Sequence, residues 1–213
     1  MPIPRLVVLI FVNVFFYEFG IKSLLYVLIA VLTTTLLDLL IEYVKNQGFL
    51  SIIENPFGIY RDFKTKQWMF PQSALVSGLL IGGLLAQELK WHVYVIAGII
   101  AIASKHLIRF QQKHTFNPAN FGILLVSVIF GAQHTWWVSS QIILVLIFGI
   151  FIIWRLRRFD LAISFLVSYY VINSIVELLK GAQSSEIFYT IINGSIIYFF
   201  SMYMLIEPRT NPS

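Results

Sequence analysis

Long runs of apolar residues alternate with short polar segments along the chain, and this pattern predicts a series of membrane-spanning helices. A helix needs about 20 apolar residues to cross a hydrocarbon core of about 30 Å, and most of the runs approach that length. We place about eight spans, at residues 3–19, 23–44, 72–86, 91–108, 118–132, 138–154, 161–179 and 187–206. The sequence therefore predicts an all-α, polytopic integral membrane protein, with residues 1–213 forming a single transmembrane domain.

The composition supports this interpretation. Hydrophobic residues make up 58% of the chain and charged residues 12%, whereas about a quarter of the residues of a typical soluble domain are charged. A chain with so little polar surface is suited to a lipid bilayer. The absence of cysteine excludes disulfides, cysteine-ligated iron–sulfur clusters and thiolate zinc sites. Because the histidines show no paired ligand spacing on one helix face, we expect no metal site.

The lysines and arginines predict the orientation of the spans, because short cytoplasmic loops carry an excess of them. With the N-terminus inside, only Lys22, Lys90 and Lys180 of the 15 basic residues fall in outer loops. This bias favours an even number of spans and places both termini in the cytoplasm. It also accounts for the basic net charge without nucleic acid as a partner. The polar stretch 45–71 is predicted to be a cytoplasmic loop or an interfacial segment.

Three acidic residues lie within predicted spans, where a charge is costly and often marks a functional site. Asp38 and Glu42 are one helical turn apart near the cytoplasmic end of the second span, and Glu177 lies near the outer end of the seventh. We interpret them as a candidate path for a cation or a proton. The alternative is structural, since each side chain can reach the headgroups or pair with a lysine such as Lys45 or Lys180.

The polar segment 104–122 gathers the candidate ligand-binding side chains. Asn117 is well placed to cap a helix whose first residue is Pro118. The amides of such a first turn carry partial positive charge and attract anions. The residues alone leave two alternatives open, a capped helix after a basic loop and a ligand site.

A stripe of small residues predicts close packing of the third span. Ala74, Gly78, Gly82 and Ala86 recur every four residues, and small residues at that spacing let helix backbones approach each other. The alternative is close approach to a flat ligand such as an isoalloxazine ring.

Three stretches of the sequence resemble the NqrB/RnfD family. They are Ser-Lys-His (104–106) followed by His-Thr-Phe-Asn-Pro-Ala-Asn-Phe-Gly (114–122), Ser-Ala-Leu-Val-Ser-Gly-Leu-Leu (73–80), and Met-Leu-Ile-Glu-Pro-Arg-Thr-Asn-Pro (204–212). The resemblance covers residues 72–213. That family contains the flavin-bearing membrane subunits of the sodium-pumping NADH:quinone reductase and of the Rnf electron transport complex. The resemblance implies a urea-transporter-like helical architecture, a bacterial-type inner membrane and other subunits as partners, and it leaves open whether the chain forms an oligomer.

The resemblance also implies a function in flavin-dependent electron transport coupled to ion movement, as a component of a redox-driven oxidoreductase complex. Family members attach FMN to a threonine in a Ser-Gly-Ala-Thr-like motif, and no such motif follows Asn117-Pro118-Ala119. A flavin, FMN or riboflavin, is therefore expected to be held noncovalently. The predicted flavin-binding residues are Lys105, His106, His114, Phe116, Asn117, Pro118, Ala119 and Arg209. The alternatives are a small-solute or flavin transporter or channel with the same fold, and a noncatalytic scaffold subunit.

Overall fold

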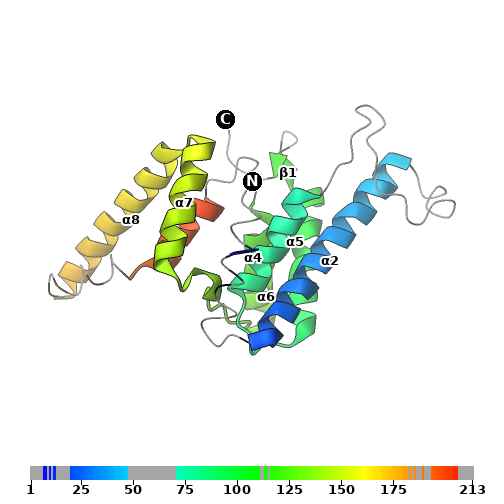
Figure 1. The fold of residues 1–213 in the computed structure, drawn as a ribbon, viewed down its shortest axis with the longest axis horizontal. Helices are drawn as coiled ribbons and strands as arrows, with labels where there is room; N and C mark the ends of the chain where they lie inside the picture. Colours follow the sequence, from blue (N-terminus) through cyan, green and yellow to red (C-terminus); the bar gives the residue numbers. More distant parts are fainter. Residues whose placement is uncertain are drawn as a thin grey trace. The chain divides into compact units, whose positions relative to one another are not determined.

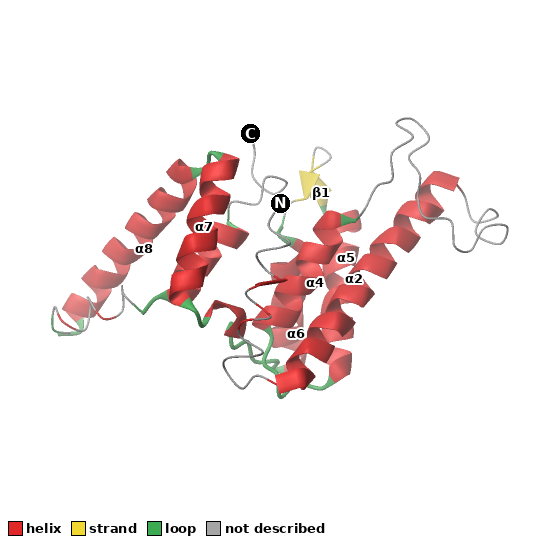
Figure 2. Cartoon of the chain, viewed as in Figure 1, coloured by secondary structure: helices red, strands yellow, loops and turns green. Residues whose placement is uncertain are grey.

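The computed structural model describes residues 20–47, 71–110, 113–114, 116–181 and 193–205, together with the single positions 7, 8, 10, 12, 183, 185 and 189. These residues are mostly helical (Figure 2). They form two compact units, one made of Phe19–Thr135 and the other of Met1–Glu18 with Trp136–Ser213. Most of the predicted first span, nearly all of the predicted loop 45–71 and the residue Arg209 lie outside the described residues. The single transmembrane domain stays a prediction.

The described residues of the unit Phe19–Thr135 form four helices that lie side by side (Figure 1). They are α2 (Gly20–Gln47), α4 (Gln72–Leu84), α5 (Trp91–Leu107) and α6 (Pro118–Phe130). Each coincides with one of the predicted apolar runs to within a few residues. Between α5 and α6 the chain forms two short antiparallel strands, β1 (Arg109–Phe110) and β2 (Lys113–His114).

The polar and apolar faces of helix α2 are arranged as expected for a helix surrounded by lipid rather than by water. Its buried face includes the polar side chains of Ser23, Thr34 and Asp38. The opposite face exposes a row of leucines, Leu25, Leu28, Leu32, Leu36 and Leu40. A helix on the surface of a soluble protein shows the reverse arrangement. Polar groups facing protein and leucines facing outward are typical of a helix in a membrane, where polar side chains turn toward the bundle interior.

Helices α4 and α6 both end after 13 residues. At 1.5 Å per residue each is about 20 Å long, which is short of the hydrocarbon thickness of about 30 Å. After α4 the chain is extended at Leu85, and after α6 it turns at Gly131, which has the left-handed conformation. The two segments then pair: the Thr135 N–H donates to the Leu84 carbonyl at 3.0 Å, and the Ala86 N–H donates to the Gln133 carbonyl at 3.0 Å. The Tyr94 hydroxyl donates to the Ala86 carbonyl at 2.8 Å. These bonds satisfy backbone groups that would otherwise be costly in an apolar environment.

The second unit contains α7 (Ile142–Leu156), α8 (Phe159–Leu179) and α10 (Ser195–Phe199), which continues into a π-helical turn, Phe200–Met204. A short 3₁₀ turn, Trp137–Ser139, precedes α7. Gly149 of α7 lies against Met202, and the Tyr203 hydroxyl donates to the Val145 carbonyl at 3.3 Å. In α8 only Ala162 is buried. An apolar helix with so much exposed surface requires lipid or another protein around it.

Among the described residues, two helical segments are long and apolar enough to cross a membrane, Lys22–Val44 in α2 and Phe159–Leu179 in α8. The other apolar helices are shorter: Gln72–Leu84, Trp91–Leu107, Pro118–Phe130, Ile142–Leu156 and Ser195–Met204. The structure therefore agrees with a helical membrane protein. The eight predicted crossings and the urea-transporter-like architecture stay predictions.

Candidate functional site

A group of four ionisable side chains, three of them buried, joins α2 to α5. The Lys105 ammonium lies 2.6 Å from Oδ2 of Asp38, and Nε2 of His106 lies 2.7 Å from the other carboxylate oxygen, Oδ1. On its opposite side, Nδ1 of His106 lies 3.8 Å from Oε1 of Glu42. We call Asp38, Glu42, Lys105 and His106 the ionic cluster. It unites two pairs of residues that the sequence analysis had assigned to different roles, an ion path and a flavin site.

Burial separates the members of the ionic cluster into an inner and an outer part. The residues Asp38 and Lys105 are 3% and 7% exposed, and the His106 side chain is 4% exposed. The Glu42 side chain is 38% exposed. The imidazole of His106 therefore lies between a buried carboxylate and one that reaches the surroundings. Nε2 is within hydrogen-bond distance of Asp38, whereas Nδ1, at 3.8 Å from Glu42, is beyond it.

The pattern of α2 explains why Asp38 is buried. Its buried positions Ser23, Val27, Ala30 and Thr34 recur at helical spacing, and Asp38 continues this face one turn beyond Thr34. Lys105 and His106 occupy the last turn of α5. Cations are favourable there because the free carbonyls at a helix C-terminus carry partial negative charge.

Glycines bring α4 and α5 close enough to α2 to assemble the site. A Cβ built on Gly78 of α4 would lie 2.5 Å from the Thr34 hydroxyl oxygen and from Cα of Val31, so only glycine fits there. A Cβ built on Gly98 of α5 would lie 3.1 Å from Cγ2 of Thr33. The contacts of Gly78 and Gly98 with α2 lie about one helical turn from Asp38.

The prediction of close helix packing at the small-residue stripe is confirmed for Gly78 and Gly82, which contact α2.

The charged groups of Asp38 and Lys105 and the imidazole of His106 are stable inside the helical bundle only because they form ion pairs and hydrogen bonds with one another. An isolated buried carboxylate or ammonium would lose several kcal/mol of hydration, on the order of the whole stability of a domain. Each oxygen of Asp38 has its own donor, one from Lys105 and one from His106. Lys105 is therefore the immediate counter-ion of the buried carboxylate.

The helix cap predicted at Asn117 is present. Oδ1 of Asn117 accepts hydrogen bonds from the backbone N–H groups of Ala119, at 3.0 Å, and Asn120, at 3.3 Å. The Phe121 N–H donates to the Asn117 carbonyl at 3.0 Å, and Pro118 has no N–H. The amides of this first turn are thus already bonded within the chain. A ligand oxygen at this turn would have to compete with the cap.

The other predicted flavin-binding residues are distributed as follows. Pro118 and Ala119 are buried in α6, whereas Phe116 is exposed and its ring stacks on that of Phe121, with centroids 5.6 Å apart. His114 belongs to β2, and its side chain, like the whole of Arg209, lies outside the described residues. The structure therefore brings Lys105 and His106 together with Asp38, and the assignment of these eight residues to a flavin stays a prediction.

Glu177, the third predicted ion-path residue, belongs to the second unit. Its carboxylate lies 2.9 Å from the Lys180 ammonium, three residues further along the chain, and both side chains are substantially exposed. This is the pairing that the structural alternative anticipated. An exposed pair at this spacing contributes little to stability.

The partners of Asp38 that the structure describes, Lys105 and His106, belong to α5 and were not among the pairings expected from the sequence. A signal was present, because the loop charges placed the end of the second span and the end of the fourth at the same membrane surface. Opposite charges near two helix ends on one side of a membrane are candidates for pairing.

Comparison with known proteins agrees with this picture at a coarse level. No family model matches the sequence. Over 122 residues the chain is 28% identical to a protein of Yersinia enterocolitica whose name describes one component of an ion-translocating oxidoreductase complex. The aligned part makes up 57% of this chain and 30% of the relative, so the chain spans about a third of that protein's length. The chain is therefore similar to a component of a complex that combines oxidoreductase chemistry with ion translocation.

Proposed function

We propose that this chain is a membrane component of an electron transport complex and that its ionic cluster takes part in moving a cation or a proton. The observation that carries the proposal is the burial of Asp38 between Lys105 and His106 in a helix of membrane-spanning length. Ionisable residues inside membrane helices are rare and usually mark ion or proton pathways. The name of the similar protein from Yersinia enterocolitica supports the same class of function.

The contacts suggest how the ionic cluster works. Asp38 has one Lys105 ammonium as counter-ion, so a transported cation or proton takes this place when the ammonium withdraws. His106 is hydrogen-bonded to Asp38 and lies 3.8 Å from Glu42, so an approach of the Glu42 carboxylate or a bridging water completes a proton path between the outer Glu42 and the inner Asp38. In the second state the Lys105 ammonium pairs instead with Glu42, the other carboxylate of the ionic cluster, so that the site has two charge-balanced states. A charge-balanced state is needed because an unpaired charge at this depth is strongly unfavourable.

The proposal is tested on the intact complex, purified through a tag on this chain from its native membrane and reconstituted into liposomes. Electron transfer is started with a chemical reductant and a soluble quinone, and the uptake of protons and of radioactive sodium is followed. The double variant Asp38→Asn with Lys105→Met removes the charge pair without leaving an unpaired charge. We expect it to retain electron transfer while ion uptake falls to the level of protein-free liposomes.

A matched control is the double variant Glu88→Gln with Lys90→Met, which makes the same change in charge at exposed positions after α4. It should leave ion uptake unchanged. The proposal for the ionic cluster is wrong if the Asp38 and Lys105 variant pumps like the wild type. The proposed membership of a redox complex is wrong if the tagged wild-type chain purifies without redox partners and without reductant-driven ion uptake.

The noncovalent flavin is a separate proposal that rests on the family resemblance. The described residues fit it incompletely, because the first-turn amides of α6 are bonded to Asn117 and the polar ends of Lys105 and His106 face Asp38. An aromatic surface is present at Phe116, which is exposed and stacked on Phe121. No step of the proposed ion movement depends on the flavin.

The flavin proposal is checked by the visible spectrum of the purified protein before and after precipitation with acid. A flavin chromophore that is released into the acid supernatant is the expected result, since no covalent link is predicted. Phe116→Ala should then lower the flavin content, because the exposed ring would no longer stack on the isoalloxazine. A protein that stays colourless after incubation with FMN and with riboflavin would remove the flavin from the proposed function.

A further inference from the structure

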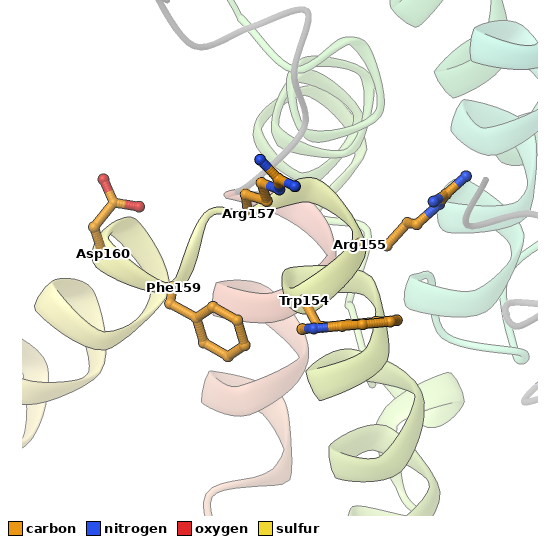
Figure 3. A pocket seen from close by; sticks show the side chains of 5 residues that line it. All are labelled: Trp154, Arg155, Arg157, Phe159 and Asp160. Carbon is orange, nitrogen blue, oxygen red and sulfur yellow. The ribbon is translucent and has the colours of Figure 1, made fainter.

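The turn between α7 and α8 contains a cavity of about 460 Å³ that is separate from the ionic cluster. Its lining consists of two arginines, two aromatic residues and one acidic residue, namely Arg155, Arg157, Trp154, Phe159 and Asp160 (Figure 3). The volume is within the range of about 300–1,000 Å³ that is typical of small-molecule sites. The described residues that line the cavity all belong to the second unit, and they come from α7, α8 and the turn between them.

The backbone of this turn places an arginine in the left-handed conformation that, at helix ends, is usually adopted by glycine. Helix α7 ends at Leu156, and the next residue, Arg157, has the left-handed conformation with φ 55°. The Arg157 N–H donates to the Trp154 carbonyl and the Arg158 N–H donates to the Ile153 carbonyl, which closes the helix end. Glycine is the usual residue at this position because a side chain costs on the order of 1 kcal/mol there. A strained non-glycine residue beside a cavity suggests that its side chain has a function.

The charges around the cavity favour an anion with several oxygens. The side chains of Arg155 and Arg157 are both exposed, and Figure 3 shows Arg157 above the turn, with Arg155 extending to one side of it and Asp160 lying on the other. Within the described residues, neither guanidinium forms a salt bridge with a carboxylate. A guanidinium presents a planar fork of donors that matches two oxygens of a phosphate.

The apolar surroundings of the cavity determine which phosphate compound fits. Trp154 is 62% exposed and Phe159 is also exposed, and aromatic rings of this kind are typical of the membrane–water interface. From the cavity, exposed apolar side chains continue along both helices, including Ile147 and Ile150 of α7 and Ile163 and Val167 of α8. A soluble phosphate would leave this apolar surface uncovered, whereas the acyl chains of a lipid would cover it.

We propose that the cavity at the α7–α8 turn binds the phosphate headgroup of an anionic phospholipid. In this complex Arg157 binds the phosphate oxygens, Arg155 adds positive potential at the edge of the cavity, Trp154 and Phe159 contact the glycerol region, and the acyl chains lie along α7 and α8. Basic cavities between membrane helices are suited to this chemistry because the negative headgroup is attracted while its chains stay in the hydrocarbon.

The proposal is tested with the full-length protein in a nonionic detergent, by native mass spectrometry during titration with phosphatidylglycerol and, separately, with phosphatidylcholine. The wild type should bind phosphatidylglycerol preferentially. Each arginine near a membrane surface contributes about fivefold to the affinity for an anionic lipid. The double variant Arg155→Gln with Arg157→Gln should therefore bind phosphatidylglycerol about 30-fold more weakly than the wild type. Binding of phosphatidylcholine should change much less.

Arg158→Gln is the matched control, because Arg158 belongs to the same turn but does not line the cavity. We expect phosphatidylglycerol binding to this variant to be close to that of the wild type. The single variants Arg155→Gln and Arg157→Gln are measured beside it. If Arg158→Gln loses as much affinity for phosphatidylglycerol as either of them, binding depends only on the total charge of the turn, and the proposal is overturned. Displacement of the lipid by glycerol phosphate or inorganic phosphate at comparable concentration would show that a soluble phosphate is the ligand, and would overturn the choice of a lipid. Circular dichroism of each variant verifies that the helices are intact.

Discussion

Replacing Asp38 with asparagine should destabilise the protein by about 3–5 kcal/mol, because the change leaves the buried Lys105 ammonium without its counter-ion. The two groups are 2.6 Å apart and the residues are less than a tenth exposed. Asparagine keeps the shape of the side chain, so the loss reports the charge rather than a cavity. The measurement is the free energy of unfolding in detergent micelles, followed by tryptophan fluorescence.

The Lys105→Met variant and the double variant complete this experiment. Replacing both members of a buried ion pair removes the unpaired charge, and such a replacement is often close to neutral. We therefore expect the double variant to be more stable than Asp38→Asn alone, with a coupling energy of roughly 2–3 kcal/mol. A loss of less than about 1 kcal/mol in Asp38→Asn would contradict the buried pair, since a carboxylate in contact with lipid headgroups or water behaves in that way.

Gly78→Ala should destabilise the packing of α4 against α2 by about 1–3 kcal/mol. The new Cβ would lie 2.5 Å from the Thr34 hydroxyl oxygen and from Cα of Val31, and a backbone atom cannot move without moving its helix. The loss should appear although alanine favours a helix over glycine by about 1 kcal/mol. Thermal unfolding in the same detergent measures it.

Gly98→Ala is the matched control for this prediction. It makes the same change in the interior of a helix that also packs against α2, but its Cβ would lie 3.1 Å from the Thr33 methyl group, which is the end of a side chain. A small adjustment accommodates it, and the helix propensity of alanine offsets part of the remaining strain. Equal melting temperatures for Gly78→Ala and Gly98→Ala would show that the close contact at Val31 is not the cause.

Several features of the fold could be predicted from the sequence because they depend on local composition. Apolar runs gave the positions of α2, α4, α5, α6 and α8 to within a few residues, since helix formation in an apolar environment follows hydrophobicity over a window of this length. Asn117 was predicted as a cap because asparagine before Pro118 satisfies the requirements of a helix start within three residues. Such features involve residues that are neighbours along the chain.

The candidate site was only half predictable, for a physical reason. The sequence identified Asp38, Glu42, Lys105 and His106 as unusual, because a charge near the middle or the end of an apolar run is costly wherever it points. It assigned them to two separate roles, since no local rule relates residues that are 67 positions apart. Their contact depends on how closely α2 and α5 approach, and that distance is decided by packing at Thr33, Thr34 and Gly98.

The sequence by itself determined that the chain is rich in apolar helices, that it has no cysteine chemistry and that few charged residues lie within its apolar runs. These properties follow from composition and spacing. Only the tertiary structure decided that Asp38 is neutralised by Lys105 and His106, that Glu177 pairs with Lys180, and that two arginines and two aromatic rings surround one cavity. The reason is that the energy of a charge depends on the atoms within a few ångströms of it, and folding brings those atoms together from distant parts of the chain.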